Sequence, residues 1–262
     1  MRYRRNLANH SDSAGRWFSV ARSEEVIARH VVQTQILGQE IAVWRDDAGA
    51  VNAWENRCPH RGVRLSIGRN NGTELQCQYH GWRFASGSGQ CTFIPAHPSQ
   101  KPASTIHAAT HAVREEHGFV WACLDAPAYP LPELPAGATT LRSIVVEAPH
   151  AAVAQALLHG YSFAADPGVA DAVTLGAEVV ATGPFVFRTA GIGERATTVM
   201  FLLQPHTESQ TVMHAALFDA APAHAAASPE PPAPDARAKR MALLRHHNVR
   251  MTALRDRLEG SP

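Results

Sequence analysis

Two short segments concentrate the residues that can bind a metal. They are Cys58-Pro59-His60-Arg61-Gly62 and Cys77-Gln78-Tyr79-His80-Gly81-Trp82. Each supplies one thiolate and one imidazole, in the pattern Cys-x-His, sixteen intervening residues, then Cys-x-x-His. This set suits a two-iron cluster in which both cysteines bind one iron and both histidines bind the other. Pro59 stiffens one loop, and Gly62 and Gly81 let backbone N–H groups approach the sulfide atoms.

A closed zinc site is the alternative, because the same four side chains can form a Cys₂His₂ tetrahedron. Zinc modules usually pair cysteine with cysteine on one knuckle and histidine with histidine on a helix, whereas each loop here is mixed. The spacing therefore favours the iron cluster, which would colour the protein reddish-brown. The remaining cysteines, Cys91 and Cys123, are predicted to be small buried core residues.

The elements that position the two loops are predicted to be short strands. Residues 41–45 and 51–54 flank the turn Asp46-Asp47-Ala48-Gly49, and Trp82-Arg83-Phe84 leads into a second, glycine-rich hairpin turn at residues 85–89. A further strand is expected at residues 118–124. These patterns predict an all-β domain over residues 15–125, after an N-terminal tail at residues 1–14.

The second half of the chain has a different pattern. Four prolines in residues 126–138 indicate a linker, placed at residues 126–142. Beyond it, residues 143–262 predict a small helix-on-antiparallel-sheet domain, so that the whole chain is α+β. The expected elements are a helix at 151–159, strands at 179–181, 185–189, 197–204 and 211–218, a flexible Ala- and Pro-rich loop at 220–235 and a final helix at 236–259.

Composition excludes several classes of protein. The 262 residues include 24 Lys and Arg and 23 Asp and Glu, a net charge of +1, which argues against nucleic-acid or membrane-surface binding. With 45% hydrophobic residues the chain is globular rather than disordered. No membrane span is visible, and the start of the chain lacks the apolar core of a signal peptide. We therefore expect a cytoplasmic protein.

Beyond the ligand pattern, the chain resembles the Rieske domain of the Rieske non-haem iron oxygenases, in particular the demethylase-like branch that includes vanillate O-demethylase. The resemblance rests on Trp17–Ala21, Leu37-Gly38, Val43–Asp46, Asn56–Gly62, Cys77–Phe84, Ile94–Ala96 and Gly118–Trp121. It implies a Rieske [2Fe-2S] cluster in which Cys58 and Cys77 bind the inner iron, His60 and His80 bind the outer iron, and Trp82 packs beneath. Respiratory-chain Rieske proteins carry an extra cysteine in each cluster loop. This chain has Tyr79 instead, so it is more similar to the oxygenase type.

The resemblance also implies a mononuclear Fe(II) held by two histidines and a carboxylate in the second domain. The family motif is an Asp, a His three residues later and a second His five residues after that. In the corresponding residues 153–168, anchored by Phe163 and Pro167-Gly168, these three positions are Leu158, Tyr161 and Asp166. The family motif is thus absent from this chain. A rebuilt two-His-one-carboxylate site would combine His159 and Asp166 with a distant residue such as His150, His206 or Asp256.

These features lead to one hypothesis and two alternatives. The chain is interpreted as the Rieske component of an oxygenase, relaying single electrons from a ferredoxin or flavin reductase to a mononuclear iron on a partner subunit. The resemblance implies a trimeric or hetero-oligomeric ring and O₂-dependent hydroxylation or demethylation of an aromatic or apolar small molecule. The alternatives are a complete oxygenase with an unusual iron site and a stand-alone Rieske electron carrier.

Overall fold

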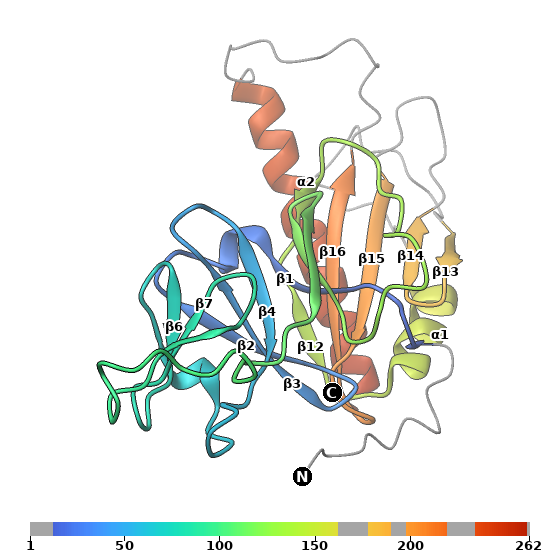
Figure 1. The fold of residues 1–262 in the computed structure, drawn as a ribbon. Coiled ribbons are helices and arrows are strands. Elements are labelled where there is room, and N and C mark those ends of the chain that lie inside the picture. The colour runs from blue at the N-terminus through green and yellow to red at the C-terminus, as the bar shows by residue number, and fades with distance from the viewer. Residues whose placement is uncertain (1–12, 162–177, 190–197, 219–233, 261–262) are drawn as a thin grey trace. The chain divides into compact units, whose positions relative to one another are not determined.

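The computed structural model describes residues 13–161, 178–189, 198–218 and 234–260 (Figure 1). The chain divides into two units, residues 1–132 and residues 133–262. The division falls at Pro132, within the proline-rich segment, where missing backbone donors disfavour sheet pairing. The expected tail at residues 1–14 and loop at residues 220–235 lie almost wholly outside the described residues.

The described part of the first unit consists of antiparallel strands and short 3-10 helices, which confirms the expected all-β architecture. Its strands form the sheets β1-β10-β9, β2-β3-β4 and β5-β6-β7-β8. Their bounds are β1 (Phe18–Arg22), β2 (Val31–Ile36), β3 (Gln39–Arg45), β4 (Val51–Glu55), β5 (Arg69–Asn70), β6 (Glu74–Gln76), β7 (Arg83–Ala85), β8 (Cys91–Phe93), β9 (Ala112–Glu116) and β10 (Phe119–Cys123).

The β3–β4 hairpin forms the centre of this unit. Its turn is closed by the Asp46 carboxylate, which accepts a hydrogen bond from the Ala50 N–H at 2.8 Å, and by Gly49 with a positive φ of 89°. Trp44 and Trp54 meet edge to face with their ring centroids 5.1 Å apart, and both are almost completely buried. The hairpin expected at residues 41–54 is confirmed.

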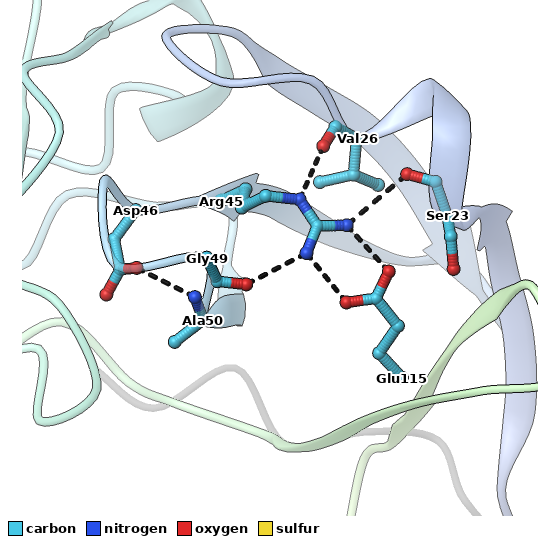
Figure 2. A network of polar contacts seen from close by, with 7 residues as sticks. All are labelled: Ser23, Val26, Arg45, Asp46, Gly49, Ala50 and Glu115. Carbon is cyan, nitrogen blue, oxygen red and sulfur yellow. Dashed lines mark hydrogen bonds and ion pairs between the residues drawn. The ribbon is translucent and has the colours of Figure 1, made fainter.

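Arg45, the last residue of β3, joins this hairpin to a second sheet (Figure 2). Its guanidinium binds the Glu115 carboxylate of β9 through two parallel hydrogen bonds of 2.6 and 2.8 Å. It also donates to the carbonyl oxygens of Val26, Gly49 and Ser23. Such bidentate pairs fix orientation as well as distance. The hydrogen bond from Arg45 lowers the pKa of Glu115, although partial burial opposes that shift.

The same hairpin also anchors the β7–β8 turn. The Ser86 hydroxyl donates to the Asp46 carboxylate at 2.6 Å, and the Gly87 N–H donates to the Asn52 side-chain oxygen at 2.7 Å. Because Asn52 is buried, its side-chain NH₂ group donates to the Ser86 hydroxyl of this turn instead of to water. The β3–β4 hairpin is therefore hydrogen-bonded to both of the other sheets of the first unit.

The second unit is a mainly antiparallel sheet with helices packed on it, as expected for an α+β chain. Its strand order is β11-β16-β15-β14-β13, with β12 also paired to β16. Helix α1 contacts β13 and β15, and helix α2 contacts α1 and β12. The bounds are β11 (Thr139–Thr140), β12 (Ile144–Val146), α1 (His150–Gly160), β13 (Val179–Gly183), β14 (Val186–Thr189), β15 (Thr198–Pro205), β16 (Thr211–Phe218) and α2 (Pro234–Leu258).

One part of the expected linker is structured. Residues 139–140, near the end of the predicted 126–142 segment, form β11 and pair with β16. Two threonines are too few to show the alternation of apolar and polar residues that predicts a strand. They form a strand here by pairing with the longer β16. Within the described ranges, no helix has the length and apolarity needed to cross a membrane.

The Arg45–Glu115 pair predicts a pH-dependent contribution to stability. Because the pKa of Glu115 is lowered in the folded state, its contribution is complete above the ordinary pKa of 4.5 and is lost as the pH falls through the lowered value. Glu115→Gln should therefore reduce the free energy of unfolding by about 1–2 kcal/mol at pH 7, and by less near pH 3. Urea unfolding at both pH values measures this difference.

The matched control is Glu116→Gln on the same strand. Glu116 is more exposed and its ion pair with Arg114 is longer, at 3.7 Å, so its loss should cost less than about 0.5 kcal/mol. Equal effects of the two substitutions would contradict the role given to Arg45.

Candidate metal centre

The first predicted ligand loop is a closed turn that starts at Cys58. The Cys58 N–H donates to the Val63 carbonyl at 2.8 Å, and the Gly62 N–H donates back to the Cys58 carbonyl at 2.8 Å. Gly62 has a φ of 71°, which L residues rarely adopt, so the glycine allows the chain to reverse within five residues. His60 lies at the tip of this turn and is exposed.

The second loop repeats the same hydrogen bonds. The Cys77 N–H donates to the Trp82 carbonyl at 2.8 Å, and the Gly81 N–H donates to the Cys77 carbonyl at 3.1 Å. Gly81 has a φ of 69°, and a Cβ added there would lie 3.0 Å from Pro95. The histidine is the third residue after the cysteine here and the second in the first loop.

The first loop is fastened at its base by the buried residue Asn56. The Asn56 and Ser66 side chains are joined at 2.9 Å, and the Ser66 N–H donates to the Asn56 side-chain oxygen at 2.7 Å. The Asn56 N–H in turn donates to the Glu40 carbonyl of β3 at 3.0 Å. The position of the loop therefore follows directly from the β3–β4 hairpin.

The two thiols lie inside the protein. Cys58 and Cys77 are 4% and 2% exposed, and they belong to the apolar core that also contains Leu65, Leu75 and Phe84. Burial, assisted by the adjacent Cys77, raises the pKa of the Cys58 thiol to about 12. The backbone N–H groups of the His60 loop act in the opposite direction, since they hydrogen-bond the Cys58 sulfur and favour its thiolate.

The two imidazoles lie at the surface and next to each other. The ring centroids of His60 and His80 are 4.7 Å apart, and both side chains are exposed. The Trp82 ring stacks on the His60 ring with nearly parallel planes, and their centroids are 4.3 Å apart. The centroids of the Tyr79 and His80 rings are 3.9 Å apart. Desolvation, followed by the charge of His80, lowers the pKa of His60, which favours the neutral, metal-binding form of the ring.

All four predicted ligands are thus brought together as two pairs, with sulfur inside and nitrogen outside. Within the described residues, which include all four, no three His, Cys, Asp or Glu side chains converge on one ion. This donor set fits a binuclear cluster with two sulfur and two imidazole ligands better than a single tetrahedral ion. Cys91 and Cys123 are buried free thiols, as expected for core residues.

Sequence reasoning gave no positioning role to two residues of this centre. Asn56 fastens the first loop, and Tyr79 covers His80. The sequence offered one signal for Tyr79, a large aromatic residue between two ligands in a glycine-containing loop. Trp82, expected beneath the cluster, is half-buried and lies flat against the His60 ring.

Residues 16–112 match the family model of the Rieske [2Fe-2S] domain. This chain carries a Rieske [2Fe-2S] domain. Its relatives include oxidoreductase NdmD of Pseudomonas putida, which is 43% identical over 209 residues, or 76% of this chain and 35% of NdmD. Another is the 3-chlorobenzoate-3,4-dioxygenase oxygenase subunit of Comamonas testosteroni, 36% identical over 121 residues, or 45% of this chain and 28% of that protein. The chain is therefore related to components of Rieske non-haem iron oxygenases.

The chain spans about a third of the length of the curated relatives it matches. Solved structures share its fold over a longer region. The structure of Pseudomonas putida CBB5 NdmA with caffeine has a TM-score of 0.68 and 15% identity, and covers 93% of this Rieske chain and 81% of NdmA. Dicamba monooxygenase bound to dicamba has a TM-score of 0.62 and 20% identity, covering 79% of this chain and 78% of that one.

The segment expected to hold a mononuclear iron shows a different arrangement. Leu158 is a half-buried residue of α1, and Tyr161 follows the end of that helix. The Tyr161 hydroxyl lies 2.9 Å from Nδ1 of His247 in α2, and both side chains are buried. Asp166, the third expected position, lies outside the described residues.

The other donors considered for a rebuilt iron site have different neighbours. The His150 ring lies against Phe185, the His206 imidazole contacts the Gln210 side chain, and Asp256 binds Arg255 at 2.6 Å. His159 is exposed on α1. The described residues thus do not bring these groups together.

Burial keeps the Tyr161–His247 pair uncharged. It raises the pKa of the Tyr161 phenol, and it lowers the pKa of His247 to about 3, with His246 and Arg250 acting in the same direction. A neutral hydrogen bond therefore connects α1 to α2 at the position where the family motif would place a metal ligand.

The buried His247 predicts a loss of stability in acid. Its folded pKa of about 3 lies below the ordinary value of 6.5, so the unfolded chain binds the proton more readily. The stabilising effect of keeping the ring neutral is complete above pH 6.5 and decreases as the pH falls toward 3. His247→Gln keeps a hydrogen-bonding side chain but cannot titrate, so it should reduce the pH dependence by up to about 1.4 kcal/mol per pH unit.

The measurement is the free energy of unfolding between pH 7.5 and pH 4 for wild type and variant. The control is His159→Gln, which makes the same substitution at an exposed position of α1, and its effect on stability should be smaller than that of His247→Gln. A wild-type and His247→Gln difference that is the same at every pH would contradict the prediction.

Proposed function

We propose that Cys58, Cys77, His60 and His80 hold a [2Fe-2S] cluster, and that this chain is the Rieske component of a hetero-oligomeric oxygenase. It would take electrons from a ferredoxin or flavin reductase in the cytoplasm. It would deliver them to a mononuclear iron on a partner subunit. Residues 15–125 would form the cluster domain, residues 126–142 the linker and residues 143–262 a shortened oxygenase-type domain. When bound, such a cluster accepts and releases one electron at a time.

The observation that carries this proposal is the polarity of the site. The sulfur pair is sealed in the apolar core, and the imidazole pair is exposed at the surface. The residues of the chain thus shield one side from water and leave the other accessible to a redox partner. Trp82 and Tyr79 hold the two rings through direct contact, which limits their movement during repeated transfers.

Delivery to another chain is supported by the second unit. Leu158 has no atom that can bind a metal, and the Tyr161 hydroxyl already contacts His247. Electrons collected at the imidazole pair would therefore be used on a partner that holds its own iron. Several relatives bear the name of an oxygenase subunit or component, which agrees with an assembly of separate parts.

The substrate class is proposed from the structural relatives. NdmA was solved with caffeine and with theobromine, and dicamba monooxygenase was solved with dicamba. These ligands are small and contain aromatic rings. We infer that the assembled system hydroxylates or demethylates an aromatic or apolar small molecule with O₂.

Substitution of three of the cysteines provides the sharpest test of the ligand assignment. Cys58→Ser and Cys77→Ser should abolish the cluster, seen as loss of visible absorption and of the paramagnetic signal after dithionite reduction. Cys91→Ser is the matched control, since Cys91 is equally buried in the same apolar core but lies outside the ligand loops. It should retain about two iron atoms per chain. Cluster loss in all three variants, or in none, would contradict the assignment.

The relay has its own prediction. The purified chain should contain about two iron atoms, accept one electron from dithionite and form no product from aromatic substrates under O₂. Turnover should begin when a mononuclear-iron oxygenase subunit is added to the reduced chain. A third iron with turnover in the isolated chain would instead identify a complete oxygenase, and reduction without transfer to any oxygenase subunit would identify a stand-alone carrier.

A further inference from the structure

Three polar side chains form a row across neighbouring strands of the second unit. Ser143 directly precedes β12, His214 lies on β16 and Gln204 lies on β15 (Figure 1). The antiparallel register of β12 and β16 places Ser143 opposite His214. Gln204 lies two residues along β15 from the residue that pairs with His214. Because alternate residues of a strand share a face, the three side chains lie on the same face of the sheet.

Hydrogen bonds join these side chains in sequence. The Ser143 hydroxyl lies 2.8 Å from Nδ1 of His214, and Nε2 of the same ring lies 2.9 Å from the side-chain oxygen of Gln204. That oxygen can only accept, so the neutral ring carries its proton on Nε2, and Nδ1 accepts from the Ser143 hydroxyl. A hydroxyl bound to a base that a third group orients is the arrangement that activates nucleophilic serines.

The two ends of this row differ in their access to water. Gln204 and His214 are 0% and 2% exposed, whereas Ser143 is half-buried. Val145, two residues after Ser143, is 47% exposed, and Val212, which pairs with Val145, is half-buried. The hydroxyl therefore lies at the accessible end of the row, beside apolar side chains, and the imidazole that binds it is sheltered from water.

We propose that Ser143 is a nucleophile, activated by His214, that takes the acyl group of small apolar carboxylic esters. The Ser143 oxygen would attack the ester carbonyl carbon while its proton moves to Nδ1 of His214. The bond from that carbon to the alcohol oxygen then breaks, and the alcohol leaves with the proton from His214. A water molecule that gives its proton to the same imidazole then releases the carboxylic acid and restores the hydroxyl. Gln204 is a positioning residue, which keeps Nδ1 turned toward Ser143.

The class of ester follows from the surroundings of the hydroxyl. Val145 and Val212 favour an apolar acyl group over a charged one, because a charged group would lose hydration beside them without gaining a partner. The reaction uses none of the four cluster ligands. It is therefore an activity beyond the proposed function and independent of it.

The first test is labelling of the full chain with an alkyl fluorophosphonate, which bonds activated serine oxygens through phosphorus and releases fluoride. Mass spectrometry of the digested protein should locate the label on Ser143. Ser143→Ala should remove it, and His214→Gln should slow labelling about 100-fold, because a general base contributes that much or more to such a step. The matched control is Ser209→Ala, which removes an exposed serine of the same unit and should keep the wild-type rate.

Gln204 is tested by a pair of substitutions. Gln204→Leu removes the acceptor of the Nε2 proton and should slow labelling about tenfold. Gln204→Glu keeps an acceptor at that position and should restore most of the rate, which a purely structural role would not predict. Equal rates in the two variants would contradict the positioning role.

Ser143→Cys tests the base without altering the buried part of the row. A thiol beside an imidazole has a pKa below its ordinary value of about 8.5, so alkylation by iodoacetamide at position 143 should begin at lower pH. Ser209→Cys is the exposed control, and its alkylation midpoint should lie about one pH unit higher or more. Equal midpoints would overturn the activation of Ser143 by His214.

The ester itself is tested with p-nitrophenyl butyrate. The wild-type chain should release p-nitrophenolate faster than Ser143→Ala does. Equal rates, or no fluorophosphonate label on Ser143, overturn this inference and leave the proposed function standing. Labelling of Ser143 in a purified chain that shows no cluster signal would contradict the proposed function alone.

Discussion

The site depends on one backbone interaction that occurs twice. In each ligand loop a cysteine N–H bonds the carbonyl five residues later, while a glycine N–H bonds back to the cysteine carbonyl. This closed turn buries the thiol at its base and raises the histidine to its tip. A longer or open loop would let the thiol move toward water or the imidazole toward the core. The separation of sulfur from nitrogen is therefore a property of the turn, and Gly62 and Gly81 make it possible.

The rest of the first unit keeps these turns in place. The β3–β4 hairpin binds the first loop through Asn56 and the β7–β8 turn through Asp46 and Asn52. Arg45 ties the same hairpin to β9. These links are hydrogen bonds between segments far apart in the chain, so each restricts the geometry of the frame. A ligand set that must meet within a few ångströms requires such a frame, because metal sites tolerate little error in ligand position.

Much of this arrangement could be predicted from local sequence. The hairpin turns, the helix of α1 and the strands β13 to β16 follow from turn residues and from apolar periodicity, and the ligand loops follow from residue type and spacing. The contacts of Arg45 with Glu115 and of Tyr161 with His247 could not be predicted, because they join residues 70 and 86 positions apart. β11 was missed for a related reason, since two threonines become a strand only beside β16.

The Tyr161–His247 pair also bears on what the second unit can do. The Tyr161 phenol and the His247 imidazole are buried and both are held neutral, so binding a metal through the phenol would require the loss of a proton inside the protein. Their hydrogen bond instead uses the polar atoms to join α1 to α2. The exposed imidazoles of His60 and His80 belong to the other unit. The chain thus leaves one pair of imidazoles accessible at the surface and uses a buried phenol and imidazole to join two helices.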